Sequence, residues 1–401
     1  MGVKILAIET SCDDTGIAIL EASNNGDFNV LSNIVSSQIE IHKKYGGVYP
    51  MMAKREHQNN LVPVLISALK QAKLLSLFNS AELQRVKASG SKIEKQNQNF
   101  KTIEKILERE MELYKKIIPF LKKYKKPNVD LIAVTNGPGL EPCLWVGVNF
   151  AKALSYFWNI PIVPVNHIES HILVNTLENN IKFPAIALVV SGGHTQLVLM
   201  KGIGKYKILG ETRDDAAGEC LDKCAKLLRL GYPGGPIISK LAAEATDAGL
   251  LFYRSPASVK LPRPMIGTKD YDFSFSGLKT AVLYADRKVK LKNAKYKKEM
   301  ASEVQQAVID VLIKKTTKAI RDFDVKSLIL GGGVSANQEL RKQFQNKLEK
   351  ESPDTNFFVP KLDLSTDNAL MTAITGFYHK KNKKDWKNIK AESNLRISSI
   401  K

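Results

Sequence analysis

Residues 3–20 read VKILAIETSCDDTGIAIL, and residues 185–201 read AIALVVSGGHTQLVLMK. Each stretch consists of an apolar strand, a short polar turn and a second apolar strand. In both places a third strand follows, and then a helix, a strand and another helix. The repetition predicts an α/β protein built from two copies of one βββαβα unit.

The expected elements can be given as residue ranges. In the first copy they are strands at 3–9, 16–20 and 28–38, a helix at 51–74, a strand at 131–135 and a helix at 143–158. In the second copy they are strands at 185–191, 196–201 and 206–212, a helix at 217–228, a strand at 327–330 and a helix from 336.

The two polar turns, at 9–14 and 191–195, suggest how the copies would work together. Two lobes that face each other would bring both turns into a shared ligand cleft. This is the plan of the two-lobed actin, Hsp70 and sugar kinase (ASKHA) superfamily, in which a nucleotide phosphate lies between the turns. We expect lobes at 1–165 and 166–367, and a C-terminal helix and basic tail at 368–401 that packs back on the first lobe.

The composition is that of a globular protein with more than one core. The chain has 401 residues, of which 44% are hydrophobic and 25% are charged. It contains no apolar run of roughly 20 residues, and the first strand leaves no room for a signal peptide, so we expect a cytoplasmic protein with no membrane partner. Four cysteines in a chain of this length fit reduced thiols.

The formal net charge of +20 is concentrated in three segments. Residues 75–128 carry +7, and residues 286–298 and 379–401 carry +6 each. Such basic segments are typical of nucleic-acid binding, although a solvated lysine-rich surface is an equally good interpretation for each one.

Residues 75–128 interrupt the first copy between its helix and its next strand. Apolar residues at helical spacing predict a surface helical hairpin, with a flexible loop at 88–99. We expect this Lys-rich insertion to be an excursion whose loss spares the core, and it could bind nucleic-acid phosphates, dock a partner protein or do neither.

His167 and His171 lie at i and i+4 of a predicted helix, which is the spacing that allows two imidazoles to bind one metal ion. In zinc peptidases a glutamate directly follows the first histidine, whereas Glu169 lies one residue later. A peptidase is therefore disfavoured. Two histidines leave a metal under-coordinated, and several acidic residues could complete the site.

Glycine-rich turns at 191–193, 231–236 and 331–333 present backbone N–H groups that a phosphate or a sugar can approach. The chain has no Walker A lysine, and its G-x-G-x-x-A match is a poor dinucleotide fingerprint, so a nucleotide would be held in the actin-like manner. Six acidic residues in or beside polar turns are either helix caps or cleft residues: Asp13, Asp14, Asp214, Asp215, Asp222 and Asp367.

Ten segments together resemble one family. They are ETSCDDT (9–15), YGGV (45–48) with REH (55–57), GPGL (137–140), NHIESH (166–171), SGGHT (191–195), DDAAGE (214–219), FSFSGLKT (273–280), GGGVSAN (331–337) and STDN (365–368). In this order they resemble the tRNA N6-adenosine threonylcarbamoyltransferases, the TsaD family, in its bacterial type.

The resemblance implies a set of site residues. One divalent metal, Fe²⁺ or Zn²⁺, would be bound by His167, His171 and Asp367. Threonylcarbamoyl-AMP would lie against one turn and three further residues: Val189, Val190, Ser191, Gly192 and Gly193, with Asp222, Gly235 and Asn337 around the adenylate.

The resemblance also implies a reaction: transfer of the threonylcarbamoyl group to N6 of the adenosine 3′ of the anticodon in tRNAs that read codons starting with A, with release of AMP. In it, His194 would polarise the carbonyl or hold its turn, and Asp13 or Asp14 would accept the amine proton. The implied partners are tRNA, a synthase that makes the adenylate, a degenerate paralogue and a small ATPase. A kinase or ATPase of the same fold and a non-catalytic tRNA-binding subunit are the alternatives.

Overall fold

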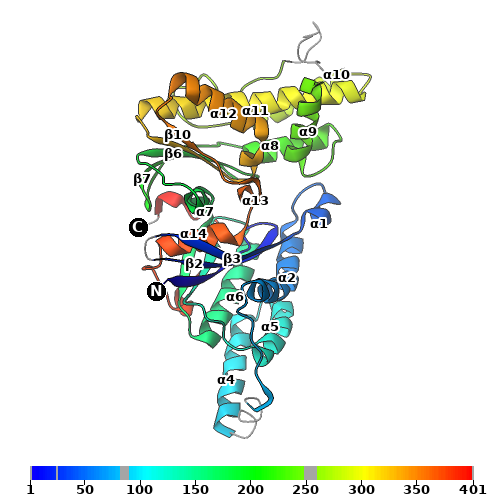
Figure 1. Ribbon diagram of the computed structural model, residues 1–401. Coiled ribbons are helices and arrows are strands. Elements are labelled where there is room, and N and C mark those ends of the chain that lie inside the picture. The colour runs from blue at the N-terminus through cyan, green and yellow to red at the C-terminus, as the bar shows by residue number, and fades with distance from the viewer. Residues whose placement is uncertain (1, 24–25, 82–89, 248–259, 400–401) are drawn as a thin grey trace. The chain divides into compact units, whose positions relative to one another are not determined.

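A computed structural model describes residues 2–23, 26–81, 90–247 and 260–399 (Figure 1). The chain folds as two compact units. Unit 1 comprises Met1–Glu40, Val48–Leu177 and Asp367–Arg396, and unit 2 comprises Ile41–Gly47, Glu178–Thr366 and Ile397–Lys401. The lobe boundaries at 165/166 and 367/368 stay a prediction; the corresponding changes of unit lie at 177/178 and 366/367.

Each unit contains one five-stranded mixed sheet. The strands of unit 1 are β1 (Val3–Glu9), β2 (Asp14–Ala22), β3 (Phe28–Ser37), β4 (Leu131–Gly137) and β5 (Ile162–Asn166), in the order β3-β2-β1-β4-β5. Those of unit 2 are β6 (Ala185–Val190), β7 (Thr195–Gly202), β8 (Lys205–Glu211), β9 (Ser327–Gly331) and β10 (Asn356–Phe358), in the order β10-β9-β6-β7-β8. Both sheets pair the first three strands antiparallel and the last two parallel, so the predicted duplication is confirmed.

Strand β5 has no counterpart in the prediction. Pro164 interrupts its apolar run, and a proline, which cannot donate a backbone hydrogen bond, argues against a central strand. The structure places β5 at the edge of its sheet, where a proline is tolerated.

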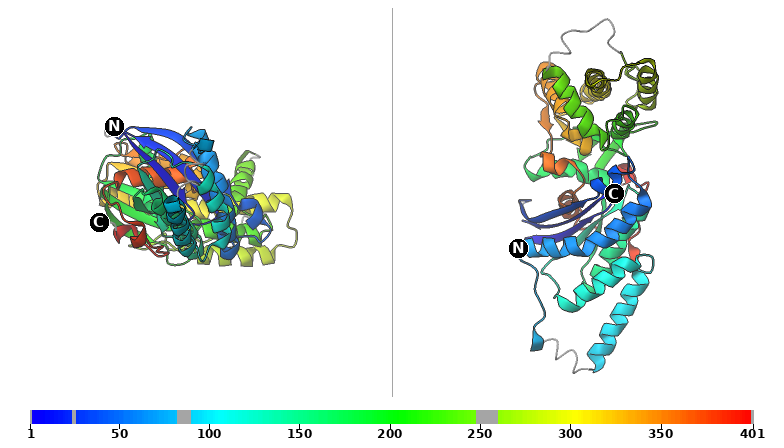
Figure 2. Two further views of the ribbon diagram at one scale, coloured as in Figure 1. Left: turned by 90° about the horizontal axis from the view of Figure 1, so that it is seen from below. Right: turned by 90° about the vertical axis from the view of Figure 1, so that its right-hand side faces the viewer.

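The helices of unit 1 cover both faces of its sheet (Figures 1 and 2). They are α2 (Pro50–Gln71), α4 (Gly90–Ile106), α5 (Met111–Lys123), α6 (Glu141–Trp158), α7 (His167–Leu173), the short helix η1 (Val174–Leu177), α14 (Ala369–Tyr378) and η3 (Trp386–Asn388). A Cβ on Gly376 of α14 would lie 2.6 Å from Ala133, whereas the neighbouring Ile132 and Val134 pack in the cluster of α2 and α6. Because side chains alternate along a strand, α14 lies on the opposite face from α2 and α6.

The inserted hairpin, α4 and α5, forms part of the hydrophobic core of unit 1. Its apolar side chains share one cluster with α2 and α6: Phe100, Ile103, Leu107, Leu113, Ile117, Phe120 and Leu121. The expectation that the insertion is an excursion whose loss spares the core is therefore wrong. The loop predicted at 88–99 is also wrong from residue 90, where α4 begins, because burial of Phe100 and Ile103 stabilises this polar helix; 88 and 89 lie outside the described residues.

Unit 2 packs its helices around a second core. They are α8 (Ala217–Leu227), α9 (Gly234–Asp247), α10 (Ser276–Lys288), α11 (Ala294–Asp322), η2 (Gly333–Ala336), α12 (Gln338–Glu351), α13 (Leu362–Ser365) and η4 (Ile397–Ser399). The short helix α1 (Ile39–Lys43) spans the change of unit at 40/41 and precedes α2 in the chain. Within the described ranges, no helix has the length and apolar character needed to cross a membrane.

Candidate functional site

The two histidines lie on a short buried helix that directly follows β5. The side chain of Asn166, the last residue of β5, caps this helix by accepting hydrogen bonds from the backbone N–H groups of Ile168 (2.9 Å) and Glu169 (3.1 Å). The helix therefore begins at His167 and places His167 and His171 one turn apart, 5% and 1% exposed. Their burial inside unit 1 argues against ordinary surface histidines.

Asp367 completes a possible metal-binding group, also within unit 1. Its Oδ1 lies 3.1 Å from Nε2 of His171 and 3.7 Å from Nε2 of His167. One ligand atom from each of the three residues lies within 4.8 Å of the others. Asn368, the next residue, caps α14, so the start of this helix holds the carboxylate against α7.

The chemistry of this group fits a divalent metal. Both ring nitrogens of His171 are buried and have no hydrogen-bond partner among the described residues, because the close approach of Asp367 lacks hydrogen-bond geometry. A buried polar atom without a partner is costly, and a metal bond would remove that cost. Two imidazoles and one carboxylate form a donor set typical of zinc and non-haem iron.

Carboxylates around the two imidazoles make this region electrostatically negative. Burial lowers the pKa of His167, but Asp367 and Glu9 outweigh it and raise the pKa to about 9. Burial, and next to it the charge of Asp367, raises the pKa of Asp14 to about 7. Carboxyl groups that disfavour each other's ionisation in this way make an environment that attracts a cation.

The turn that carries Asp13 and Asp14 is fixed by His57, a histidine for which the sequence predicted no role. His57 of α2 is fully buried, with Nδ1 2.8 Å from the hydroxyl of Thr15 and Nε2 3.0 Å from the carbonyl oxygen of Cys12. Asp14 begins β2, and its buried Oδ1 has no hydrogen-bond partner in the described part of the chain. Its position within the REH segment was the only sequence signal for His57.

Glu169 points away from the metal-binding group. Both of its carboxylate oxygens lie 2.9 Å from Nε2 of His379, just beyond the end of α14. A peptidase would need this carboxylate beside the metal-bound water, so the structure agrees with the argument from spacing.

In unit 2, the turn between β6 and β7 leaves space above its glycines. The backbone N–H of Ser191 donates to the carbonyl of His194 (2.8 Å), and that of His194 donates to the Ser191 hydroxyl (3.1 Å). A Cβ built on Gly192 or Gly193 would meet nothing within 4 Å. Another molecule could therefore approach the backbone closely here.

The other predicted ligand residues of unit 2 hold neighbouring turns. Asp222 of α8 accepts hydrogen bonds from the backbone N–H groups of Gly234 (2.7 Å) and Gly235 (3.4 Å). Asn337 caps α12 through Leu340 (2.9 Å) and donates to Gln305 (2.8 Å). Both residues therefore fix the backbone of neighbouring turns, and their contact with a ligand stays a prediction.

Three glycines that are not among the predicted ligand residues bring these turns together. A Cβ on Gly218 would lie 2.6 Å from the carbonyl oxygen of Ser191, and one on Gly332, which has φ 83°, would lie 2.4 Å from that of Val190. A Cβ on Gly234 would lie 2.6 Å from the Cα of Asp222, whereas Gly235 has no contact closer than 3.9 Å. Packing thus requires Gly218, Gly332 and Gly234, while Gly235 remains open.

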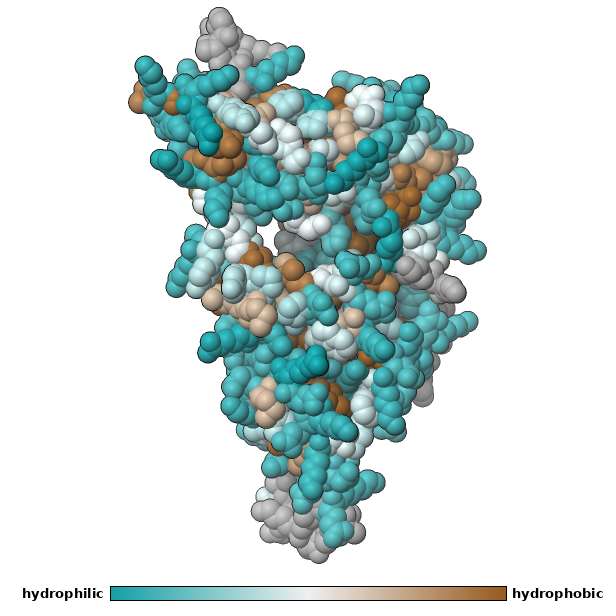
Figure 3. Space-filling view, turned by 180° about the vertical axis from the view of Figure 1, so that it is seen from behind, coloured by the Kyte–Doolittle hydropathy of each residue, from teal (hydrophilic) through white to brown (hydrophobic). Residues whose placement is uncertain are grey.

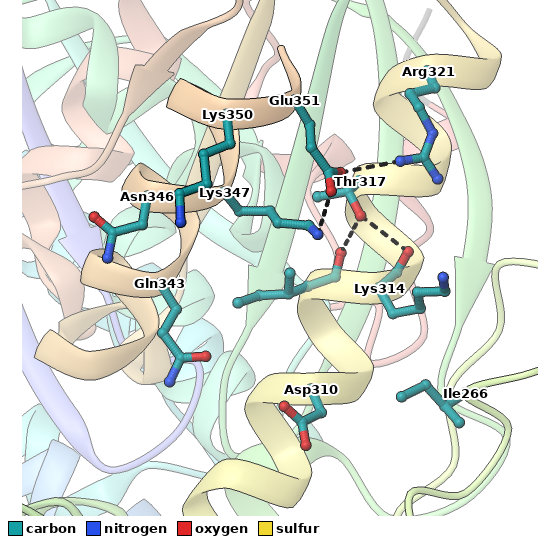
Figure 4. Close-up of a pocket in the computed structure, with 11 residues that line it drawn as sticks. Ile266, Asp310, Lys314, Thr317, Arg321, Gln343, Asn346, Lys347, Lys350 and Glu351 are labelled. Carbon is teal, nitrogen blue, oxygen red and sulfur yellow. Dashed lines mark hydrogen bonds and ion pairs between the residues drawn. The ribbon is translucent and has the colours of Figure 1, made fainter. Parts of the chain in front are cut away.

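A groove between α11 and α12 is chemically different from these turns (Figure 4). It has a volume of about 490 Å³, and its two acidic residues are already paired: Asp310 accepts from Arg263 (2.9 Å), and Glu351 from Arg321 (3.2 Å) and Lys347. Its lining contains no histidine and no glycine turn, so it offers neither the metal chemistry nor the backbone approach that the predicted site needs.

Comparison with known proteins decides the family. The model of the family "tRNA N6-adenosine threonylcarbamoyltransferase", TsaD, matches residues 29–77 and 105–374. The chain belongs to the TsaD family. Curated TsaD relatives match nearly end to end. The protein of Persephonella marina is 41% identical to this chain, and the match covers 94% of this chain and 90% of the relative. The protein of Thermosipho africanus is 40% identical, and the match covers 98% of this chain and 99% of the relative.

The solved structures support the fold of this TsaD family member. The crystal structure of T. kodakarensis HypF aligns with a TM-score of 0.51 and 13% identity over 95% of this chain. This chain covers 48% of the HypF chain, and at that identity the likeness concerns the fold alone. The TsaD model leaves residues 78–104 unmatched, so α4 lies almost wholly outside the family match.

Proposed function

We propose that this chain transfers the threonylcarbamoyl group of threonylcarbamoyl-AMP to N6 of the adenosine 3′ of the anticodon, in tRNAs that read codons starting with A. The observation that carries the proposal is the group formed by two buried histidines, His167 and His171, and the half-buried Asp367 in a chain of the TsaD family. A kinase of the same fold would give this group no role.

The chemistry demands an activated carbonyl, because the exocyclic amine of adenine is a poor nucleophile. A divalent ion, Fe²⁺ or Zn²⁺, held by His167, His171 and Asp367 would supply Lewis-acid polarisation of the carbamoyl carbonyl. The amine nitrogen forms a bond to the carbonyl carbon, the bond from that carbon to the phosphate oxygen breaks, and AMP leaves with the electron pair.

The adenylate would bind through the glycine turns of unit 2. Backbone N–H groups of the turn from Val189 to Gly193 would stabilise the charge that develops on AMP, with Asp222, Gly235 and Asn337 around the nucleoside. The support is steric: the open space above Gly192 and Gly193 is what close approach of a phosphate to the backbone requires.

The amine proton needs an acceptor. We propose Asp14 or Asp13, and favour Asp14 because its buried Oδ1 lacks a hydrogen-bond partner in the described ranges. His194 would polarise the carbonyl or hold its turn. Single-turnover transfer by Asp14→Asn and Asp13→Asn tests the assignment, and an unchanged chemical rate in either variant removes that residue.

The proposed partners are tRNA, the synthase that supplies threonylcarbamoyl-AMP, a degenerate paralogue and a small ATPase, with the reaction in the cytoplasm. The decisive experiment incubates tRNA with the protein, threonine, bicarbonate, ATP and the synthase, and follows the mass of the tRNA nucleosides. Threonylcarbamoyladenosine that depends on this chain supports the proposal. ATP hydrolysis or phosphoryl transfer without modified tRNA would favour the kinase alternative, and tRNA binding without either reaction would favour a non-catalytic subunit.

A further inference from the structure

We propose that Glu9 is the positioning residue of the metal-binding group: together with Ser11 it fixes the ring of His167 so that Nε2, and not Nδ1, faces Asp367. The inference rests on the proposed function, because a fixed ring has a use only if His167 binds a metal. It adds a residue of unit 1 that lies outside the predicted ligand set.

Glu9 is held rigidly by three parts of unit 1. It is the last residue of β1 and fully buried. Its Oε1 accepts from the backbone N–H of Ser11 (2.8 Å), and its Oε2 accepts from the hydroxyls of Thr135 in β4 (2.5 Å) and Thr372 in α14 (3.0 Å). A carboxylate with these fixed bonds cannot rotate away from its neighbours.

The ring of His167 lies against this carboxylate. Its Nδ1 is 3.2 Å from the hydroxyl of Ser11 and 3.6 Å from Oε2 of Glu9, while its Nε2 faces Oδ1 of Asp367 at 3.7 Å. An ionised carboxylate and a hydroxyl that can accept favour a proton on Nδ1. The lone pair is then on Nε2, the nitrogen that the metal would bind, and this is how outer carboxylates orient histidine ligands.

The carboxylate of Glu9 is directed at His167. The donors to Glu9 are two hydroxyls and one amide, all neutral, and the ring of His167 lies beside its Oε2 at 3.6 Å. A cation bound to the other nitrogen of that ring would be stabilised by the same carboxylate. His171 differs from His167, because neither of its ring nitrogens has a hydrogen-bond partner among the described residues. Of the two rings, that of His167 has protein groups beside the nitrogen that faces away from Asp367.

The first test measures metal affinity by competition with a chelator, using Zn²⁺ and Co²⁺ on the full chain. Glu9→Gln should bind each ion about 10 to 100 times more weakly than the parent. The matched control is Glu110→Gln, because Glu110 is also a buried acid of unit 1, 1% exposed, but is bonded to Asn149 (3.0 Å). This control should keep the parent affinity.

If Glu9→Gln fails to fold, as judged by circular dichroism, Ser11→Ala carries the test, with an expected loss of a few-fold. Parent affinity in Glu9→Gln or, in that case, in Ser11→Ala would overturn the inference and leave the proposed function standing. A parent chain that binds neither ion would overturn both the inference and the metal part of the proposed function. The transfer reaction itself is tested by the tRNA modification experiment described above.

The second test distinguishes positioning from general stabilisation. The chain has six histidines, so long-range ¹H–¹⁵N spectra of the zinc-loaded, histidine-labelled protein can be assigned with His167→Gln. In the parent we expect the His167 spectrum to show a proton on Nδ1. The signal of this proton should disappear or broaden in Glu9→Gln and stay unchanged in Glu110→Gln. A His167 ring that carries its proton on Nε2 in the parent would refute the proposal.

Discussion

The lysines of helix α5 and the residues just after it offer a test of whether the inserted hairpin helps to bind tRNA. Four of them are exposed: Lys115, Lys122, Lys123 and Lys126. Replacing all four by Ala removes charge without touching the buried face of α5. Deletion of the whole insertion would not be a clean test, because it would also expose the core of α2 and α6.

The size of the effect follows from counterion release. A cation that neutralises one phosphate contributes about 0.7 to 0.9 to the slope of log affinity against log salt concentration. If all four lysines contact tRNA, the slope should flatten by about 3. Lys116 is kept in place because its Nζ donates to the carbonyl oxygen and to Oδ1 of Asn59 (3.0 Å each), which makes it structural.

The assay is tRNA binding at several salt concentrations, combined with the KM and maximal rate of transfer. The matched control replaces four exposed lysines of unit 2, Lys314, Lys326, Lys342 and Lys350, and so changes the net charge equally. We expect a flatter slope and a higher KM in the α5 variant, with the maximal rate nearly unchanged. An α5 variant with the slope of the parent would refute tRNA binding by this helix, and the mostly hydrophilic surface of the hairpin in Figure 3 would then be a solvated face or a partner dock.

Four further outcomes are expected. Asp367→Ala should lose most of the bound metal and abolish transfer while keeping its circular dichroism, and full metal content in the purified variant would exclude this ligand. Gly193→Val should weaken a non-reactive adenylate analogue at least tenfold by calorimetry, because its side chain fills space that the protein leaves open, whereas unchanged binding would contradict an adenylate at this turn. Ile117→Ala should lower the free energy of unfolding by about 2 to 5 kcal/mol in urea, and a loss near zero would show that the hairpin is not part of the core. The hydrogen bond to Glu169 raises the pKa of His379, so the stabilisation of the fold by this pair is complete below pH 6.5 and disappears as the pH rises through the folded pKa. The substitution His379→Gln should therefore lower the free energy of unfolding more at pH 6 than at pH 9. An equal loss at both pH values would refute the pairing.

The fold was predictable because strand, turn and strand recur in two distant places. Local patterns failed where tertiary contacts decide the structure. Pro164 concealed β5, which is possible only at a sheet edge, and the polar start of α4 is helical because Phe100 anchors it against α6 and stacks on Phe157. Neither strand β5 nor the first turns of α4 can be identified from the residues adjacent in the sequence.

The site was predictable in part. Helical spacing identified His167 and His171, but the choice of Asp367 among six acidic residues came from the family resemblance. Glu9 and His57 act through partners far away in the sequence, and no local pattern distinguishes them from other buried polar residues. Long-range hydrogen bonds of this kind are visible only in three dimensions.

Helix α14 meets α7 at both of its ends: Asp367 precedes its first turn and approaches His171, and His379 follows its last turn and pairs with Glu169. Opening of the C-terminal segment would therefore break the metal-binding group as well. Thermodynamic linkage then requires that a metal bound to the closed form slow amide hydrogen exchange across α14 and the segment after it, by a factor that grows with metal concentration. A bound metal would thus stabilise the C-terminal segment of unit 1, and chelation would speed amide exchange there.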